Sequence, residues 1–418
     1  MVYWLKLIYW LLLLQTLLRC LYFWQLKEYR FDRFREFLKG GESCRYWLPG
    51  FNFLRPRLTL KILLLIFLTV YFSAWFDWWL AYFLLPLTTV VSVALIAPLS
   101  DLIKWLVIIL AKIKLLIFHR RLLVIGVTGS YGKTSTKEIL AHVLTDKFLV
   151  AKTPGTNNTL IGVALTVLIK LPCNAQVFVV EMGAYKVGEI TSICRLVKPK
   201  IGILTGINEQ HLDLFGSREN IIRAKSELLL ALPKTGLAVI NGVNPITKKL
   251  KAGQAPIKHY RFGKFKTNLL GVHQQLNIGA AIAVARYLGV EQFDLTHIPQ
   301  FKTAITQTNG LNGALIINDS YNSNPDGFLA AVDLAKTIPA KKKILISPGI
   351  IELGRASETV HQRLLTAAKT VFDCIFMAEP EKPLLRQMEK ILTKNHLLLI
   401  EGRFSKKFIK KLCLKNQS

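Results

Sequence analysis

Three long apolar blocks near the N-terminus constrain the fold more than any other feature of this 418-residue sequence. They run from Val2 to Trp24, from about Leu58 to Leu85, and from Leu87 to Phe118. A helix of about 20 apolar residues crosses the hydrocarbon core of a bilayer. All three blocks reach this length, and tryptophans lie near their edges, as at membrane interfaces. We therefore expect residues 1–120 to form two to three transmembrane helices, with a turn or kink at Pro86.

Two of the blocks allow a second interpretation. The first is interrupted by Lys6, Gln15 and Arg19, so it either spans the membrane or lies at its interface. The third carries a proline and two charged residues in its middle, so it forms either one span or a span followed by an interfacial helix. No charged segment precedes the first block and no small-residue cleavage site follows it, so we do not expect its removal as a signal peptide.

Basic residues flank the apolar blocks and outnumber acidic residues in the whole chain, with 55 Lys and Arg against 26 Asp and Glu. By the positive-inside rule the flanking clusters face the cytoplasm. These clusters comprise Arg30, Arg33, Arg35, Lys39, Arg45, Arg55 and Arg57 before the second block, and Lys112, Lys114, His119, Arg120 and Arg121 at the end of the third. Zinc-finger spacing, RNP-like runs and basic heptads are absent from the sequence, which disfavours nucleic acid as a partner. We expect membrane lipid and phosphorylated substrates as partners instead.

A phosphate-binding loop follows the apolar region. The segment LLVIGVTGSYGKTSTKEIL begins at Leu122 and is typical of a buried strand, a tight turn and a helix that begins at Lys133. Amides at a helix N-terminus attract anions. We expect Lys133 to reach the β- and γ-phosphates of a nucleotide and the Thr134 hydroxyl to coordinate Mg²⁺. The expected nucleotide-binding residues of this loop are Thr128, Gly129, Ser130, Gly132, Lys133, Thr134 and Ser135.

Further motifs follow this loop in a fixed order. They are TPGTNNTLIG (153–162), VVEMGAYKVGEI (179–190), GINEQHLDLFGS (206–217), AKSEL (224–228), NDSYNSNP (318–325) and IELG (351–354). Together with TGSYGKTST, this series resembles the Mur ligase family from about Leu122 to the C-terminus. The resemblance implies an α/β fold: a central P-loop ATPase domain with a parallel sheet over 121–300, and a C-terminal Rossmann-like ligase domain over 301–418.

The resemblance also implies an activity. Mur ligases use ATP to activate a carboxylate as an acyl phosphate, which an amine then attacks. The pattern is most similar to the branch of the family that adds D-Ala-D-Ala in peptidoglycan precursor synthesis. Two alternatives remain: a ligase for another cell-envelope or poly-amino-acid product, and a non-catalytic nucleotide-binding scaffold at the membrane.

Two polar residues follow neighbouring strands of the expected parallel sheet. Glu181 follows the apolar run Val177–Val180, and His211 follows Ile201–Thr205. Open α/β sheets place their sites at the carboxyl ends of strands. A carboxylate and an imidazole at that edge suit a bound cation. The resemblance implies that both residues bind a second Mg²⁺, so ATP and Mg²⁺ at two sites are the expected cofactors.

Lys225 lies within the apolar stripe of the helix that follows Ser217. Burial lowers the pKa of an ammonium group and favours the neutral amine, which can add CO₂ to form a carbamate. The resemblance implies a carbamylated lysine that coordinates Mg²⁺ at this position. The alternative is a lysine whose stem carries its ammonium to solvent. The expected catalytic residues are Lys133, His211 and Lys225.

The remaining site residues are assigned by the resemblance alone. Asn277 corresponds to a position near the adenine, and Asp319 and Tyr321 correspond to positions that meet the nucleotide when the last domain closes.

The sequence also departs from the family in two places. Thr303 and Ala304 stand where the family usually has a Gly-Arg pair, and Lys302 is the only nearby cation. Apolar helices stand where a soluble UDP-sugar-binding domain is expected, which leaves open whether the precursor is UDP-linked or lipid-linked.

Overall fold

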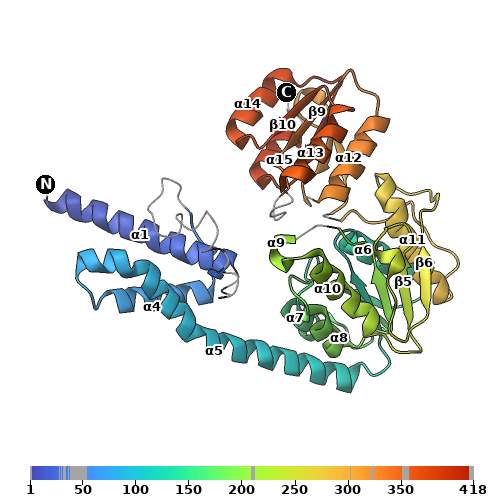
Figure 1. The fold of residues 1–418 in the computed structure, drawn as a ribbon, viewed down its shortest axis with the longest axis horizontal. Helices are drawn as coiled ribbons and strands as arrows, with labels where there is room; N and C mark the ends of the chain where they lie inside the picture. The colour runs from blue at the N-terminus through green and yellow to red at the C-terminus, as the bar shows by residue number, and fades with distance from the viewer. Residues whose placement is uncertain are drawn as a thin grey trace. The chain divides into compact units, whose positions relative to one another are not determined.

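The computed structural model describes residues 2–27, 29, 31, 34, 35, 37, 54–208, 212–301, 303–321, 324–350 and 357–413. The chain divides into two compact units, Met1–Leu106 and Val107–Ser418. Figure 1 shows that the described residues of the first unit include long helices, and that the second unit contains two sheets with flanking helices.

The first unit contains α1 (Val2–Leu26), α4 (Leu60–Ser73) and the beginning of α5 (Trp78–Phe118). Within them, Lys6–Leu26 and Trp79–Phe118 are long and apolar enough to cross a membrane, whereas α4 has only 14 residues. Large apolar side chains on these helices face outward, including Trp4 at 70% exposure and Leu60 at 84%. By length and composition, the described helices thus include two candidate spans.

The turn expected at Pro86 is wrong, whereas a kink at this residue stays a prediction. The chain turns at residues 74–77, and Pro86 and Pro98 lie inside α5. Hydroxyl groups satisfy carbonyls around the first proline: Thr88 Oγ1 donates to the Leu85 carbonyl at 3.0 Å, and Thr89 Oγ1 donates to the Pro86 carbonyl at 2.6 Å. The helix continues through both prolines.

The first sheet of the second unit is entirely parallel, as expected. Its four central strands are apolar runs buried on both faces, the pattern typical of parallel sheets, whereas the two edge strands are partly exposed. The strand order is β2-β3-β1-β4-β5-β6. These strands are β1 (Leu123–Thr128), β2 (Val150–Lys152), β3 (Val177–Glu181), β4 (Ile201–Leu204), β5 (Leu237–Asn241) and β6 (Ile257–Tyr260).

Helices cover both faces of this sheet (Figure 1). They are α6 (Lys133–Leu144), α7 (Leu160–Lys170), α8 (Glu189–Val197), α9 (Leu212–Phe215), α10 (Arg218–Leu230) and α11 (Val272–Tyr287), with a 3₁₀ turn at Thr247–Lys249. One apolar cluster joins the sheet to α7, α8 and α10, and the other joins it to α6 and α11.

The last turns of α5 belong to this unit and bury apolar side chains in it. Ala111 is fully buried in the cluster with α7, α8 and α10, and Val107 and Leu115 pack against that cluster. The Lys114 ammonium donates to the carbonyls of Leu168 at 3.1 Å and Leu171 at 3.0 Å, at the end of α7. Within the second unit, these turns therefore form part of the protein core, whereas one interpretation of the sequence made them an interfacial helix.

The second sheet has the order β10-β9-β11-β8-β7, with only β7 antiparallel to its neighbour. The strands are β7 (Thr306–Asn309), β8 (Leu315–Asp319), β9 (Lys342–Ser347), β10 (Cys374–Met377) and β11 (His396–Glu401). A 3₁₀ turn at Leu311–Gly313 and the helices α12 (Pro325–Thr337), α13 (Ser357–Lys369), α14 (Glu381–Ile391) and α15 (Lys406–Cys413) accompany them. Separate apolar clusters on the two faces make this a doubly wound, Rossmann-like arrangement, as expected.

Candidate active site

The phosphate-binding loop lies between β1 and α6, and two of its glycines have conformations that exclude other residues. Gly129 has φ 148° and Gly132 has φ 72°. A Cβ atom at Gly129 would lie 2.1 Å from Thr205 Oγ1, and one at Gly132 would lie 2.6 Å from Asn277 Oδ1. Only glycine allows the backbone to pass this close to its neighbours. The strand, turn and helix predicted from the sequence are all present.

Lys133 is the first residue of α6, and its side chain folds back over the loop. Its Nζ atom donates to the carbonyls of Gly129 at 2.8 Å and Ser130 at 2.9 Å. Burial lowers the pKa of Lys133, and the nearby Glu181 carboxylate partly opposes this. An ammonium group at a helix N-terminus is suited to bind a phosphate group. Lys133 now donates to uncharged carbonyl groups, and a bound polyphosphate would offer it negatively charged oxygen atoms instead.

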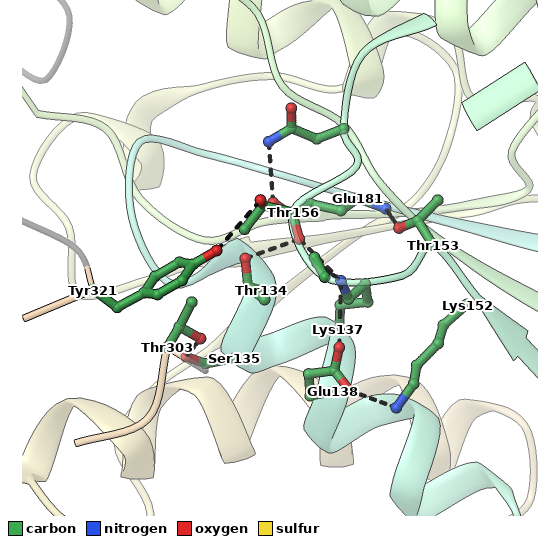
Figure 2. A network of polar contacts seen from close by, with 12 residues as sticks. Thr134, Ser135, Lys137, Glu138, Lys152, Thr153, Thr156, Glu181, Thr303 and Tyr321 are labelled. Carbon is green, nitrogen blue, oxygen red and sulfur yellow. Dashed lines mark hydrogen bonds and ion pairs between the residues drawn. The ribbon is translucent and has the colours of Figure 1, made fainter. Parts of the chain in front are cut away.

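Glu181 ends β3 and lies at the centre of the polar network in Figure 2, only 1% exposed. Its Oε2 atom accepts a hydrogen bond of 2.9 Å from Thr134 Oγ1, and its Oε1 atom accepts one of 3.1 Å from Asn158 Nδ2. The Lys137 ammonium lies 3.2 Å from Oε2. The hydroxyl of Thr134 and the carboxylate of Glu181 are hard oxygen donors side by side, the kind of donors that Mg²⁺ prefers.

A cavity of about 840 Å³ opens beside this network, within the size range of small-molecule sites. Most of the predicted site residues line it: Ser130, Gly132, Lys133, Thr134, Ser135, Glu181, Asp319 and Tyr321. Further lining residues were not predicted, namely Tyr131, Thr156, Asn158, Tyr185, Asn324, Arg403 and Lys406. The cavity therefore has one wall from the phosphate loop and another from the C-terminal domain.

Three polar contacts join these two walls. Asn208 Nδ2 donates to Asp326 Oδ2 at 2.6 Å, and the hydroxyls of Thr156 and Tyr321 lie 3.5 Å apart, the latter pair shown in Figure 2. Ser135 Oγ and Thr303 Oγ1 are also 3.5 Å apart. Thr303 and Ala304 line the cavity without a charge, and the basic residue Arg403 is also among its lining residues.

A pair of carboxyl groups lies at adjacent strand ends of the C-terminal domain, and one of them, Asp319, lines the cavity. Asp319 on β8 is opposite Glu401 on β11 in the parallel register. Burial raises the pKa of Asp319 to about 7. Burial, with the neighbouring Asp319 charge, raises the pKa of Glu401 well above its ordinary value. The pair thus retains protons under conditions in which exposed carboxyl groups have lost theirs.

Lys225 is buried on α10, as its position in the apolar stripe predicted, with 3% exposure. Its Nζ atom lies 3.5 Å from the Ala184 carbonyl and 5.6 Å from the centre of the Phe215 ring. Burial and the Lys133 charge lower the pKa of Lys225 to about 7. A large fraction of this lysine is therefore neutral near pH 7.

Asn277 and Thr128 lie behind the phosphate loop rather than in the cavity wall. Asn277 Oδ1 accepts a hydrogen bond of 3.3 Å from Thr136 Oγ1, and its Nδ2 donates to Gln274 Oε1 at 3.0 Å. Thr128 Oγ1 donates to the Met182 carbonyl at 2.9 Å. Both side chains thus form hydrogen bonds with residues around the base of the loop, a role that the sequence pattern did not indicate.

Several predicted features lie outside the described residues, among them His211, Lys302, the segment 351–354 and part of the basic cluster before the second apolar block, namely Arg30, Arg33, Lys39 and Arg45. In the described part of the chain, no cluster of three or more His, Cys, Asp and Glu side chains is arranged to hold a metal. The second metal site, which was predicted from Glu181, His211 and Lys225, therefore stays a prediction.

Comparison with known proteins identifies the domain that carries the phosphate loop. Residues 127–264 match the Mur ligase middle domain. UDP-N-acetylmuramoyl-tripeptide--D-alanyl-D-alanine ligase of Bacillus subtilis is 33% identical over 272 residues, which are 57% of this chain and 58% of that protein. The ligase of the same name from Synechocystis is 31% identical over 280 residues, 61% of each chain. This chain thus spans about three fifths of the length of these relatives.

Solved structures show the same relationship. MurF from Acinetobacter baumannii is 25% identical, with a TM-score of 0.61 over 72% of this chain and 77% of that one. MurF from Thermotoga maritima, in complex with ADP, shares the fold at 24% identity, with a TM-score of 0.62 over 74% of this chain and 82% of that one. The resemblance to the Mur ligase family that the sequence motifs predicted is confirmed.

Proposed function

We propose that this chain is an ATP-dependent ligase of peptidoglycan precursor synthesis, which joins D-Ala-D-Ala or a similar amine to a peptide carboxylate. The observation that carries the proposal is the meeting of Lys133, Thr134 and Glu181 in a cavity that the C-terminal domain completes. A phosphate loop alone would serve any nucleotide-binding protein. The second wall supplies the place where a carboxylate and an amine can meet the nucleotide.

ATP binds with its phosphates on the loop in this proposal. Lys133 and the amides at the start of α6 hold the β- and γ-phosphates, and Thr134 with Glu181 holds Mg²⁺, which supplies positive charge to the phosphates. A carboxylate oxygen of the substrate attacks the γ-phosphorus and ADP leaves. The amine then attacks the acyl carbon, loses a proton and displaces inorganic phosphate. Arg403 and Lys406, which line the opposite wall, attract the anionic substrate groups.

We further propose that Lys225 is the position of a carbamate, which would carry a negative charge towards a second Mg²⁺ with Glu181 and His211. The neutral amine of Lys225 adds CO₂ and releases one proton. Its lowered pKa of about 7 and its burial favour this reaction. A ¹³C carbamate resonance after equilibration with ¹³C-bicarbonate, present in the wild type and absent from Lys225→Met, is the expected result.

We propose a membrane location, with the second unit on the cytoplasmic side, where ATP is available. The apolar stretches Lys6–Leu26 and Trp79–Phe118 support it, as do the basic residues that follow Phe118. Full-length protein is expected to stay with membranes after extraction at alkaline pH. Release into the supernatant would contradict this location. Both a UDP-linked and a lipid-linked precursor are compatible with such a position.

The activity is tested with full-length protein purified in detergent. ADP release is measured with UDP-MurNAc-tripeptide and D-Ala-D-Ala, each alone and together, with Lys133→Ala and Glu181→Ala as inactive controls. Stimulation only by the pair is expected. Turnover with no stimulation by the pair would reject this substrate assignment in favour of another cell-envelope product. Wild-type protein that binds nucleotide without any turnover would favour a scaffold.

A further inference from the structure

Lys137 is a charged side chain in the interior that the phosphate-loop motif does not explain. It follows Lys133 by one helical turn on α6 and has 0% exposure. An ammonium group loses its hydration on burial, at a cost of several kcal/mol unless partners compensate it. A lysine at this depth therefore calls for a specific set of acceptors.

Three oxygen atoms surround the Lys137 ammonium group, two as hydrogen-bond acceptors and one as an ion-pair partner (Figure 2). Its Nζ atom lies 3.2 Å from Glu181 Oε2 and 3.3 Å from Glu138 Oε1. It also donates to the Gly155 carbonyl, in the loop after β2. One side chain thus connects α6, the end of β3 and the loop that contains two cavity-lining residues, Thr156 and Asn158.

Lys137 and Thr134 share the same oxygen of Glu181. Oε2 accepts from Thr134 Oγ1 at 2.9 Å while it faces the Lys137 ammonium, and Asn158 restrains the other oxygen. The carboxylate is therefore fixed in orientation from three sides. Because Glu181 is itself only 1% exposed, Lys137 also provides the nearest full positive charge that compensates it.

We propose that Lys137 is a positioning residue of the nucleotide site, a built-in counter-cation that holds the Glu181 carboxylate in the orientation in which it meets the Thr134 hydroxyl. The inference rests on the proposed function, in which Thr134 and Glu181 hold Mg²⁺. The metal then binds beside a resident positive charge. This charge limits the affinity for the cation and stabilises the geometry that the cation needs.

The test is a double-mutant cycle between Lys137→Met and Glu181→Gln in full-length protein, with thermal unfolding measured in EDTA. Lys137→Met leaves a buried carboxylate without its counter-charge, and we expect the melting temperature of the second unit to fall by about 10 °C. Adding Glu181→Gln removes the orphaned charge and should recover most of the loss. The matched control is Lys152→Met, because Lys152 pairs with the same Glu138, at 2.5 Å, from a side chain 43% exposed. This control should change the melting temperature little.

The second measurement separates a positioning role from a purely structural one. Stabilisation by ADP is titrated with Mg²⁺ in the wild type, Lys137→Met and Lys137→Gln. Without the resident charge, the half-saturating Mg²⁺ concentration should fall about tenfold or more. The turnover number should fall as well, since Glu181 is no longer held towards Thr134. Lys137→Gln keeps two N–H donors for packing and should show the same Mg²⁺ shift with a smaller loss of stability, so it replaces Lys137→Met if that variant does not fold.

Two results would overturn the inference. One is additivity of Lys137→Met and Glu181→Gln in EDTA, which would mean that the two charges do not interact. The other is an unchanged Mg²⁺ requirement in both lysine variants. Failure of the proposed function is distinguishable, because it would appear as wild-type protein without ligase turnover, whereas the EDTA cycle requires neither nucleotide nor turnover.

Discussion

The carboxyl pair of the C-terminal domain predicts that this domain loses stability as the pH rises. Asp319 has a pKa of about 7, raised by burial from an ordinary 3.8. Its folded form therefore holds a proton at pH values where the unfolded chain has released it. The stability that this proton provides is complete below about pH 4 and is lost progressively until about pH 7. At about 1.4 kcal/mol for each tenfold change in proton affinity, the loss is at most about 4 kcal/mol.

Asp319→Asn removes this titration while it preserves the shape of the side chain. Relative to the wild type, the variant should gain stability with increasing pH, up to about 4 kcal/mol, and the gain should level off above about pH 7. The assay is calorimetric unfolding of full-length protein in detergent at pH 5, 6, 7 and 8. Asp333→Asn, on an exposed position of α12, is the matched control and should show no such trend.

The reasoning would be refuted by a difference between Asp319→Asn and wild type that stays constant from pH 5 to pH 8. It would also be refuted if Asp319→Asn became less stable relative to the wild type as the pH rises, because the folded protein would then stabilise Asp319 as a carboxylate. Adding Glu401→Gln should remove the remaining pH dependence of the pair, since the pKa of Glu401 is raised well above its ordinary value by the same burial.

Two further predictions concern the cavity walls. Gly132→Ala places a Cβ atom 2.6 Å from Asn277 Oδ1 at a φ of 72°, so we expect ADP affinity, measured with a fluorescent analogue, to fall more than about tenfold; unchanged affinity would show that the loop adapts. Arg403→Ala removes a basic residue that lines the C-terminal wall and should raise the KM of an anionic substrate about tenfold, with Arg403→Lys intermediate. If kcat fell about tenfold instead and KM did not change, attraction of the substrate would be excluded as the role of Arg403.

The part of the site that the sequence predicted is the part in which neighbours in the chain are also neighbours in space. The phosphate loop needs only β1, four loop residues and the start of α6, so strand pattern, glycines and Gly-Lys-Thr were sufficient. Glu181 was predicted because parallel strands bring their carboxyl ends to one edge. The parallel order of the first sheet followed from its apolar strands for the same reason.

What the sequence did not predict depends on contacts between distant segments. Lys137 looks like any polar residue of a helix until Glu181, 44 positions later, and the Gly155 carbonyl are placed around it. Arg403 follows β11, and it reaches the cavity wall because β11 lies beside β8. No local sequence pattern predicts this pairing. The turn expected at Pro86 is not found, since α5 continues through the proline.

The buried lysines make nucleotide binding a proton-linked event. The pKa of Lys225 is about 7, lowered first by burial and then by the Lys133 charge. Polyphosphate bound at Lys133 would offset that charge, so the pKa of Lys225 should rise and the protein should take up protons on binding. Near pH 7 about half of Lys225 is neutral, which limits the uptake from this group to about half a proton per ADP.

Calorimetric titration with ADP in two buffers of different ionisation enthalpy measures this uptake. In CO₂-free solution we expect proton uptake in the wild type and its loss in Lys225→Met. Saturating bicarbonate should suppress it in the wild type as well, because a carbamate cannot accept the proton that the amine accepts. Uptake that persists in Lys225→Met would assign the proton to another group, and uptake that bicarbonate leaves unchanged would argue against a carbamate at Lys225.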